Sequence, residues 1–183
     1  MSIYLDNAAT TALRPAALLA LTKQLQEIGN PSSLHTFGRD ARRALEDARE
    51  KIAKFVGAKS NEIIFTSSGT ESDNLAIKGL FWRSNKKLIV ISSIEHHAVI
   101  DPANWLADKE GAEVIQIPVD KNGVVDLIFL EDLIKRRGKE ISLISVMHSN
   151  NETGVIQPIS EVIRIAGEIP VHTDAVQSLG KVK

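Results

Sequence analysis

The sequence predicts an α/β protein whose largely parallel sheet is covered by helices on both faces. After residue 57, short apolar runs alternate with segments of helical periodicity, the order expected of strand–helix–strand units. The runs KLIVISS at 87–93 and ISLISVM at 141–147 are apolar throughout rather than alternating, which is typical of strands buried on both faces. We therefore expect strands at 62–67, 87–93, 112–119, 141–147 and 169–175.

Helices are expected before and between these strands. The segment 14–29 has Pro at its second position and ends before Asn-Pro, which predicts a helix with a sharp stop. In 39–56, apolar residues recur at steps of three and four and charged residues fill the other face: Ala41, Leu45, Ala48, Ile52 and Phe55. Further helices are expected at 71–84, 98–110, 127–137 and 159–168. The chain is therefore interpreted as an N-terminal helical segment, 1–57, followed by one partial α/β domain, 58–183.

Composition narrows the classes of partner and chemistry. With 22 Lys+Arg against 23 Asp+Glu among 183 residues, the net charge of −1 gives no general attraction to nucleic acid or to anionic membranes. The N-terminus has neither a basic nor an apolar signal region, so a cytoplasmic location is expected. The absence of cysteine excludes disulfides, thiolate zinc sites and a cysteine nucleophile from these residues. The expected partner is a small ligand, and no metal site is predicted.

The stretch FTSSGTESDN follows the first expected strand and opens a helix. Ligands of such sheets bind beyond the carboxyl ends of the strands, and Gly69 and Thr70 offer backbone N–H groups at a helix N-terminus, where a phosphate binds well. The alternative is an ordinary helix cap formed by Thr70. The stretch is neither a Walker A loop nor a dinucleotide-binding glycine turn.

Two further strand ends carry polar side chains. In SSIEHHAVI, His96 or His97 can stack on a flat ring or transfer a proton; the alternative is a helix start with Glu95 in its first turn and a solvated histidine. In VMHSNNETGVIQPI, Asn150 and Asn151 can direct hydrogen bonds to a ring substituent. The alternative there is a loop that uses Asn and Gly for its own backbone geometry.

The last strand end, VHTDAVQ, places Asp174 after a buried run. A buried carboxylate needs a partner, because isolated burial costs several kcal/mol or neutralises the group. A protonated heterocyclic nitrogen meets that need, as in pyridoxal phosphate enzymes, where an aspartate keeps the pyridine nitrogen protonated. The alternative is an Asp that caps the following turn. Taken together, the four strand ends converge on one flat, phosphorylated cofactor.

The stretches YLDNAATT, NPSSLHTFGRDAR, FTSSGTESDN, EHHAV, MHSNNETGVIQP and HTDAVQSLGK resemble, in order and spacing, the N-terminal half of cysteine desulfurases of the NifS and IscS type. These are pyridoxal 5′-phosphate enzymes of fold type I, so the resemblance implies a truncated large domain of the aspartate aminotransferase-like fold. It implies that Gly69 and Thr70 contact the phosphate, that His96 stacks on the pyridine ring as a catalytic residue, and that Asn151 lies beside the ring.

The resemblance also implies roles near the end of the chain. Asp174 is similar to the aspartate on the pyridine nitrogen, and Gln177 to the residue that bonds the phenolic oxygen of the ring. His35 lies in a segment that borders the active site in the family. The family continues beyond HTDAVQ with a Ser-x-His-Lys segment, whose lysine forms the Schiff base with the cofactor, and with a loop cysteine that accepts sulfur. Neither is present here, and Lys181 and Lys183 are not expected to replace the lysine.

The implied reaction converts L-cysteine to L-alanine and leaves sulfur as an enzyme persulfide for iron–sulfur cluster or thiolation pathways. The implied partners are L-cysteine, a sulfur-acceptor or scaffold protein and, in the complete protein, a second copy in a homodimer. The 183-residue chain alone is expected to be inactive. Alternatives are a related fold type I enzyme, such as a selenocysteine lyase or aminotransferase, and a non-catalytic split or scaffold subunit. A nicotinamide-binding domain is disfavoured by the missing glycine fingerprint.

Overall fold

The computed structural model describes residues 3–182, so Lys183 lies outside the described residues. The chain forms two compact units that divide between Phe65 and Thr66, later in the sequence than the boundary expected at residue 57. Each unit is described by itself. Among residues 3–182, no helix is both long enough and apolar enough to cross a membrane.

The first unit is helical. It contains α1 (Pro15–Leu25), α2 (Thr36–Val56) and a short 3-10 turn, η1 (Ser60–Glu62). Both helices expected from the sequence are present, and α2 begins three residues earlier than predicted. His35 caps α2 by accepting a hydrogen bond from the Gly38 amide at Nδ1 (3.3 Å). Gly57 ends α2 with a φ of 71°, a conformation that glycine adopts without steric cost.

The strand predicted at 62–67 is wrong. Glu62 ends the η1 turn, and the following residues are extended but belong to no strand. Ile64 and Phe65 are 69% and 44% exposed. An apolar, β-prone run becomes a strand only when a neighbouring strand supplies hydrogen bonds, and in residues 3–182 none pairs with this one. The Ile63 carbonyl accepts instead from the Arg49 guanidinium (2.6 Å).

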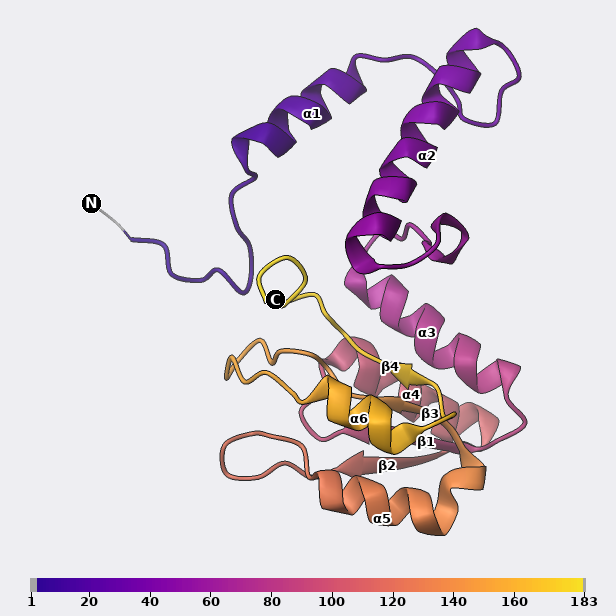
Figure 1. The fold of residues 1–183 in the computed structure, drawn as a ribbon, viewed down its shortest axis with the longest axis vertical. Coiled ribbons are helices and arrows are strands. Elements are labelled where there is room, and N and C mark those ends of the chain that lie inside the picture. The colour runs from indigo at the N-terminus through magenta and orange to yellow at the C-terminus, as the bar shows by residue number, and fades with distance from the viewer. Residues whose placement is uncertain (1–2, 183) are drawn as a thin grey trace. The chain divides into compact units, whose positions relative to one another are not determined.

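The second unit is built on a four-stranded sheet with the order β2-β1-β3-β4, in which every neighbouring pair is parallel (Figure 1). Its strands follow four of the predicted runs and are somewhat shorter: β1 (Leu88–Ser92), β2 (Glu113–Ile117), β3 (Ile141–Ser145) and β4 (Val171–His172). All residues of β1 and β3 are buried. The prediction of strands covered on both faces is therefore confirmed for the two central strands.

Helices cover both faces of this sheet, as their periodicity predicts. On one face, α3 (Gly69–Arg83) and α4 (His97–Glu110) pack with Ile89, Ile91 and Leu143 in one buried cluster. On the other face, α5 (Leu127–Arg137) and α6 (Ile159–Ala166) pack with Leu88 and Val90 in a second cluster. A second 3-10 turn, η2 (Gly138–Glu140), leads from α5 into β3. Successive residues of β1 thus pack into the two hydrophobic clusters on opposite faces of the sheet.

The edge strand β4 is shorter than the predicted strand at 169–175. Only Val171 and His172 pair with β3. The backbone stays hydrogen-bonded to the segment after β3 as far as Asp174, whose carbonyl accepts from the His148 amide, and then forms a turn in which the amides of Ser178 and Leu179 both bond the Ala175 carbonyl. An edge strand has a partner on one side only, so its ends are free to turn away. Asp174 therefore lies just beyond the last strand residue, His172.

Candidate functional site

The loops that follow β1, β3 and β4 are hydrogen-bonded to one another in a row. The Met147 amide donates to Oε1 of Glu95 (2.7 Å), and Nδ2 of Asn150 donates to the Ile94 carbonyl (3.1 Å), which joins the β1 loop to the β3 loop. The His148 amide donates to the Asp174 carbonyl (2.8 Å), which joins the β3 loop to the end of β4. The sequence-predicted residues of these loops therefore share one edge of the sheet.

The N-terminus of α3 has the geometry of an anion site. Ser68 caps the helix, because its Oγ accepts from the Glu71 amide (3.2 Å), so the alternative in which Thr70 is the cap is wrong. In the described part of the chain, the amides of Gly69 and Thr70 donate no hydrogen bond, as expected at the first positions of a helix. Helix N-termini with free amides attract phosphate groups. The amides expected to contact a phosphate are therefore free in the described chain, and their binding role stays a prediction.

The side chain of Glu71 folds back over the same loop. One of its oxygens, Oε2, accepts from both the amide (2.7 Å) and the hydroxyl (2.5 Å) of Ser67. These hydrogen bonds, the one from the hydroxyl first, lower the pKa of Glu71, because they favour the ionised carboxylate. The loop before α3 is thereby held in a fixed shape.

Gly69 lies close to the loop that carries Asp174. A β-carbon added to Gly69 would lie 2.8 Å from Cγ2 of Val176, which is closer than two carbon atoms approach without something moving. Glycine at this position therefore lets the N-terminus of α3 approach the turn after β4. The phosphate cradle and the Asp174 loop are next to each other in the same unit.

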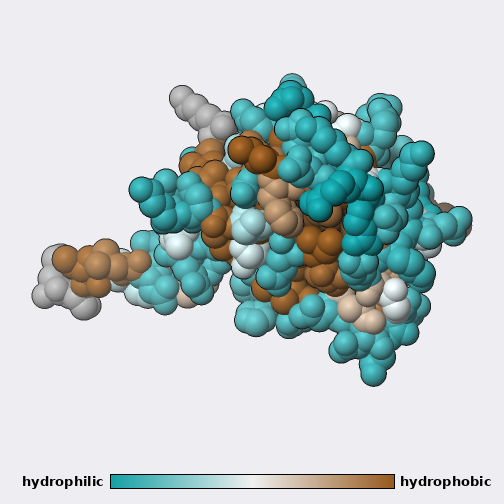
Figure 2. Space-filling view, turned by 90° about the horizontal axis from the view of Figure 1, so that it is seen from below, coloured by the Kyte–Doolittle hydropathy of each residue, from teal (hydrophilic) through white to brown (hydrophobic). Residues whose placement is uncertain are grey.

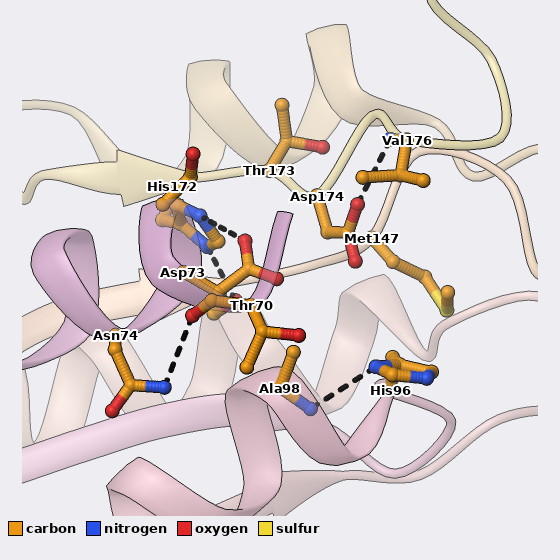
Figure 3. Close-up of polar contacts among 12 residues, drawn as sticks. Thr70, Asp73, Asn74, His96, Ala98, Met147, His172, Thr173, Asp174 and Val176 are labelled. Atoms are coloured by element: carbon orange, nitrogen blue, oxygen red, sulfur yellow. Dashed lines mark hydrogen bonds and ion pairs between the residues drawn. The ribbon is translucent and has the colours of Figure 1, made fainter. Parts of the chain in front are cut away.

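Asp174 is a buried carboxylate, only 8% exposed. Its Oδ1 accepts from the Val176 amide at 2.9 Å, as Figure 3 shows, and this is the turn-capping role left open by the sequence. That hydrogen bond orients the side chain without supplying a positive charge. Capping and binding of a cationic ring nitrogen are compatible, because a carboxylate accepts several hydrogen bonds.

The two adjacent histidines differ in their contacts. His96 is exposed and is the N-cap residue of α4, where its Nδ1 accepts from the Ala98 amide (3.1 Å; Figure 3). In this geometry Nδ1 carries no proton, so the ring proton is on Nε2. His97 points to the next turn of α4 and pairs with Asp101 (3.3 Å). Of the two, His96 is the ring held at the sheet edge.

The two adjacent asparagines are also separated by the structure. Asn150 is buried, and its Oδ1 accepts from the Glu152 amide (3.0 Å) and from the amide and hydroxyl of Thr153 (2.9 and 3.1 Å). It therefore shapes the loop, which is the alternative reading of this stretch. Asn151 is exposed, and its side chain makes no hydrogen bond among the described residues. Asn151 is the one available to a ligand.

Gln177 lies in the turn after Asp174 and is partly buried. Nζ of Lys181 lies 3.5 Å from Oε1 of Gln177, so this lysine is held along the turn rather than placed near β1 or β3. Lys183 is outside the described residues. Among residues 3–182, no group of three His, Cys, Asp or Glu side chains could hold a metal ion.

Sequence reasoning missed a second layer of polar groups behind these residues. Asp73 is 4% exposed, and its Oδ1 lies 3.3 Å from Nε2 of His172, as Figure 3 shows. Nδ1 of His172 lies 2.9 Å from Oγ of Ser145, which is fully buried in β3. Asp73 lies in the polar stretch 71–74 and His172 between Val171 and Thr173, so neither gave a clear signal of burial. The sequence spacing alone did not predict that Asp73 and His172 contact each other.

Glu95 is a further buried carboxyl group that the sequence assigned only to a helix start. It precedes the cap of α4 rather than lying in its first turn, and it is 6% exposed. Burial raises its pKa, although hydrogen bonds from Ser92 (2.5 Å) and the Met147 amide oppose the shift. The nearby charge of His172 acts to lower this pKa and that of Asp174 to raise it.

A family model described as aminotransferase class-V matches residues 3–183. The chain belongs to this family. Among curated relatives, a cysteine desulfurase IscS of Dictyoglomus turgidum is 54% identical over 98% of this chain, and an IscS-like cysteine desulfurase of Mycobacterium tuberculosis is 46% identical over 97% of it. These alignments cover 46% and 47% of the relatives, so the chain spans about half the length of the curated relatives it matches.

Solved structures with a similar fold include proteins of the same kind. A NifS-like protein superposes with a TM-score of 0.90 at 39% identity, covering 97% of this chain and 50% of the other. SspA in complex with cysteine superposes with a TM-score of 0.88 at 36% identity, covering 97% and 51%. The resemblance to the N-terminal half of NifS- and IscS-type proteins is confirmed, as is the fold type I large domain.

Pyridoxal 5′-phosphate, the cofactor expected from the sequence, is the cofactor of this family. The residues present fit it at two points of the structure. The close approach of Gly69 to Val176 leaves the free amides of α3 beside the Asp174 loop, and the buried Asp174 carboxylate has a backbone amide but no cationic side chain among its hydrogen-bonding partners in the described chain. The free amides of α3 and the buried carboxylate of Asp174 thus lie on neighbouring segments.

Proposed function

We propose that this chain is the N-terminal, cofactor-binding part of a pyridoxal phosphate-dependent cysteine desulfurase. The observation that carries the proposal is Asp174, a carboxylate 8% exposed at the end of β4 and oriented by the Val176 amide. Isolated burial of such a charge is costly, and a protonated pyridine nitrogen compensates it. The names of the relatives, at up to 54% identity in the curated matches above, support cysteine as the substrate.

In this proposal the chain holds the cofactor at both ends. The free amides of Gly69 and Thr70 donate to the phosphate, with the positive end of the α3 dipole behind them. At the other end, Asp174 keeps its charge beside the ring nitrogen and so holds a proton there. The fixed Ser67–Glu71 contacts keep the cradle from rearranging when the phosphate binds.

Three side chains orient the ring between these ends. His96 stacks on the ring face, with its orientation fixed by the Ala98 amide. Asn151 directs its free amide to the ring edge, and Gln177 bonds the phenolic oxygen. When bound, pyridoxal phosphate supplies an electron sink for the bond that is broken. The contribution of this chain is to maintain the charge at the ring nitrogen and to hold the ring flat against His96.

The proposed reaction converts L-cysteine to L-alanine and transfers the sulfur to an enzyme thiol. That thiol lies outside these 183 residues, which contain no cysteine. We further propose a sulfur-acceptor or scaffold protein as partner, a homodimer, a role in iron–sulfur cluster assembly and a cytoplasmic location. Exposed apolar side chains of the second unit, among them Trp82 (59% exposed) and Leu179 (61%), support association, and Figure 2 shows hydrophobic patches between hydrophilic ones on one face.

The test uses the full-length protein that carries this sequence. It is purified with its cofactor and supplied with L-cysteine, and the release of L-alanine and sulfide is measured in the presence of a thiol reductant. We expect equal amounts of both products from L-cysteine and none from L-serine, which lacks the sulfur. A protein that binds pyridoxal phosphate but leaves L-cysteine unchanged contradicts the assigned reaction, and one that binds no pyridoxal phosphate contradicts the whole proposal.

A further inference from the structure

Asp73 and His172 form a buried pair behind the candidate site, and neither is expected to contact a ligand. Nε2 of His172 and Oδ1 of Asp73 are 3.3 Å apart, and their side chains are 12% and 5% exposed. The other oxygen of Asp73, Oδ2, is buried and has no hydrogen-bond partner in the described part of the chain. His172 is therefore the side chain that compensates this carboxylate, and breaking the contact would leave a buried charge without a partner.

The pair joins the two elements that carry the ends of the proposed cofactor site. Asp73 lies on α3, within about one helical turn of Gly69 and Thr70. His172 is the last residue of β4, and Asp174 follows it immediately beyond the strand. The position of α3 relative to β4 therefore fixes how far the free amides of α3 lie from the carboxylate of Asp174.

His172 is itself fixed from a third element. Its Nδ1 lies 2.9 Å from the hydroxyl of Ser145, the last residue of the central strand β3, which pairs with His172 in the sheet. With one ring nitrogen on β3 and the other on α3, the imidazole cannot rotate without losing a contact. Figure 3 shows the ring between β4 and α3, with Asp73 reaching it from the helix.

We propose that the Asp73–His172 pair is a positioning device that sets the separation between the phosphate-binding end of α3 and the carboxylate of Asp174. The pair acts through these elements and touches neither cofactor nor substrate. This inference rests on the proposed function, because a fixed separation matters only to a ligand that is held at both ends.

The test compares the affinity of the full-length apoprotein for pyridoxal phosphate with its affinity for pyridoxal, which lacks the phosphate. The dissociation constant for pyridoxal divided by that for pyridoxal phosphate measures how much affinity the phosphate group adds once the ring end is bound. Asp73→Ala removes the contact together with the buried carboxylate, and we expect this ratio to fall about tenfold, because small displacements at a site have large effects. Asp73→Asn keeps an acceptor oxygen, and its ratio should stay within about twofold of the wild type.

A matched control separates positioning from stability. Ile77→Ala removes a fully buried side chain from the same helix, so it should lower the Tm at least as much as Asp73→Ala while leaving the ratio unchanged. A lowered Tm with an unchanged ratio in Asp73→Ala would show that the pair only stabilises the fold and would overturn the proposal.

A second variant keeps the proposal testable if Asp73→Ala does not fold. In His172→Gln, the amide can retain one of the two contacts but not both, so a smaller fall of the ratio is expected, and a wild-type ratio contradicts the positioning role. Failure of the proposed cofactor site is distinguishable, because the wild-type protein would then bind neither pyridoxal phosphate nor pyridoxal, whereas failure of the assigned reaction alone leaves this ratio measurable.

Discussion

At the scale of single residues, Glu95 shows how burial changes a titration. Its Oε1 accepts from Ser92 and Met147, while Oε2 is buried and has no partner among the described residues. Burial raises the pKa of Glu95 above its ordinary value of 4.5. The folded chain therefore keeps this proton at pH values at which the unfolded chain has released it, so this group makes the protein less stable as pH rises through that window.

Replacement of this carboxyl by an amide should remove that part of the pH dependence. We expect Glu95→Gln to gain stability relative to the wild type as the pH is raised from about 5 to about 8, since glutamine has no proton to lose. Denaturant unfolding of the full-length protein across this range measures the difference. His172 and Asp174 are the charged groups that act on Glu95 and are present in both proteins. Parallel stability curves for the two proteins would contradict the assignment.

Gly69 is a residue whose small size has a specific reason. A β-carbon there would lie 2.8 Å from Cγ2 of Val176, so Gly69→Ala should displace the turn that carries Asp174 or the N-terminus of α3. We expect affinity for pyridoxal phosphate to fall about tenfold or more, because small displacements at a site have large effects.

The double variant Gly69→Ala/Val176→Ala is the control for this steric argument. Removing the methyl groups of Val176 opens the space that the new β-carbon needs, so most of the affinity should return. Equilibrium titration of the full-length apoprotein measures both. Wild-type affinity in Gly69→Ala alone, or no recovery in the double variant, shows that this contact is not what limits binding.

At the scale of elements, the loop between β3 and α6 separates a structural residue from a binding residue at adjacent positions. Asn150 holds the loop to the Ile94 carbonyl and to Thr153, and Asn151 is exposed with a free side chain. Asn150→Ala should therefore cost about 1–3 kcal/mol of unfolding free energy, since buried partners lose their hydrogen bonds.

Asn151→Ala is the matched variant. It should change unfolding free energy by less than about 0.5 kcal/mol, while the absorbance of bound pyridoxal phosphate shifts because a ring-facing amide is lost. Denaturant unfolding and the cofactor spectrum are measured on the same preparations. If Asn151→Ala destabilises the fold as much as Asn150→Ala, the separation of roles is incorrect.

Some strands could be predicted from their own residues alone, and others could not. The runs at β1 and β3 were predictable because strands buried on both faces are apolar at every position. The run at 62–67 contains three consecutive apolar residues, 63–65, yet it is not a strand, because pairing depends on a neighbour that sequence proximity does not supply. Ile64 is accordingly left 69% exposed.

The same distinction applies to the site. The places of Gly69 and Asp174 were predictable, because Gly69 lies at a recognisable helix start and Asp174 follows a recognisable apolar strand. Asp73 and His172 were not assigned and Glu95 was assigned only to a helix start, because their roles depend on which side chains meet across α3, β4 and the loop after β1. Contacts between distant segments leave only a weak signal in one sequence.

At the scale of the whole molecule, this chain covers about half of its relatives' length, and in the proposed function it carries one side of the cofactor site. It holds no thiol that could take sulfur from a substrate, because none of its 183 residues is cysteine. We therefore expect the 183-residue chain, incubated with pyridoxal phosphate and L-cysteine, to release no more L-alanine than free pyridoxal phosphate does. Release that rises in proportion to the concentration of the chain would contradict this expectation.

The central claim is that Asp174 holds a proton on the ring nitrogen of pyridoxal phosphate. The most direct test is the protonation state of that nitrogen, observed by nuclear magnetic resonance in the full-length protein loaded with cofactor isotopically labelled at the ring nitrogen. We predict a protonated nitrogen in the wild type at neutral pH and an unprotonated one in Asp174→Asn, which has a similar shape but no charge. The same protonation state in both proteins would contradict the account.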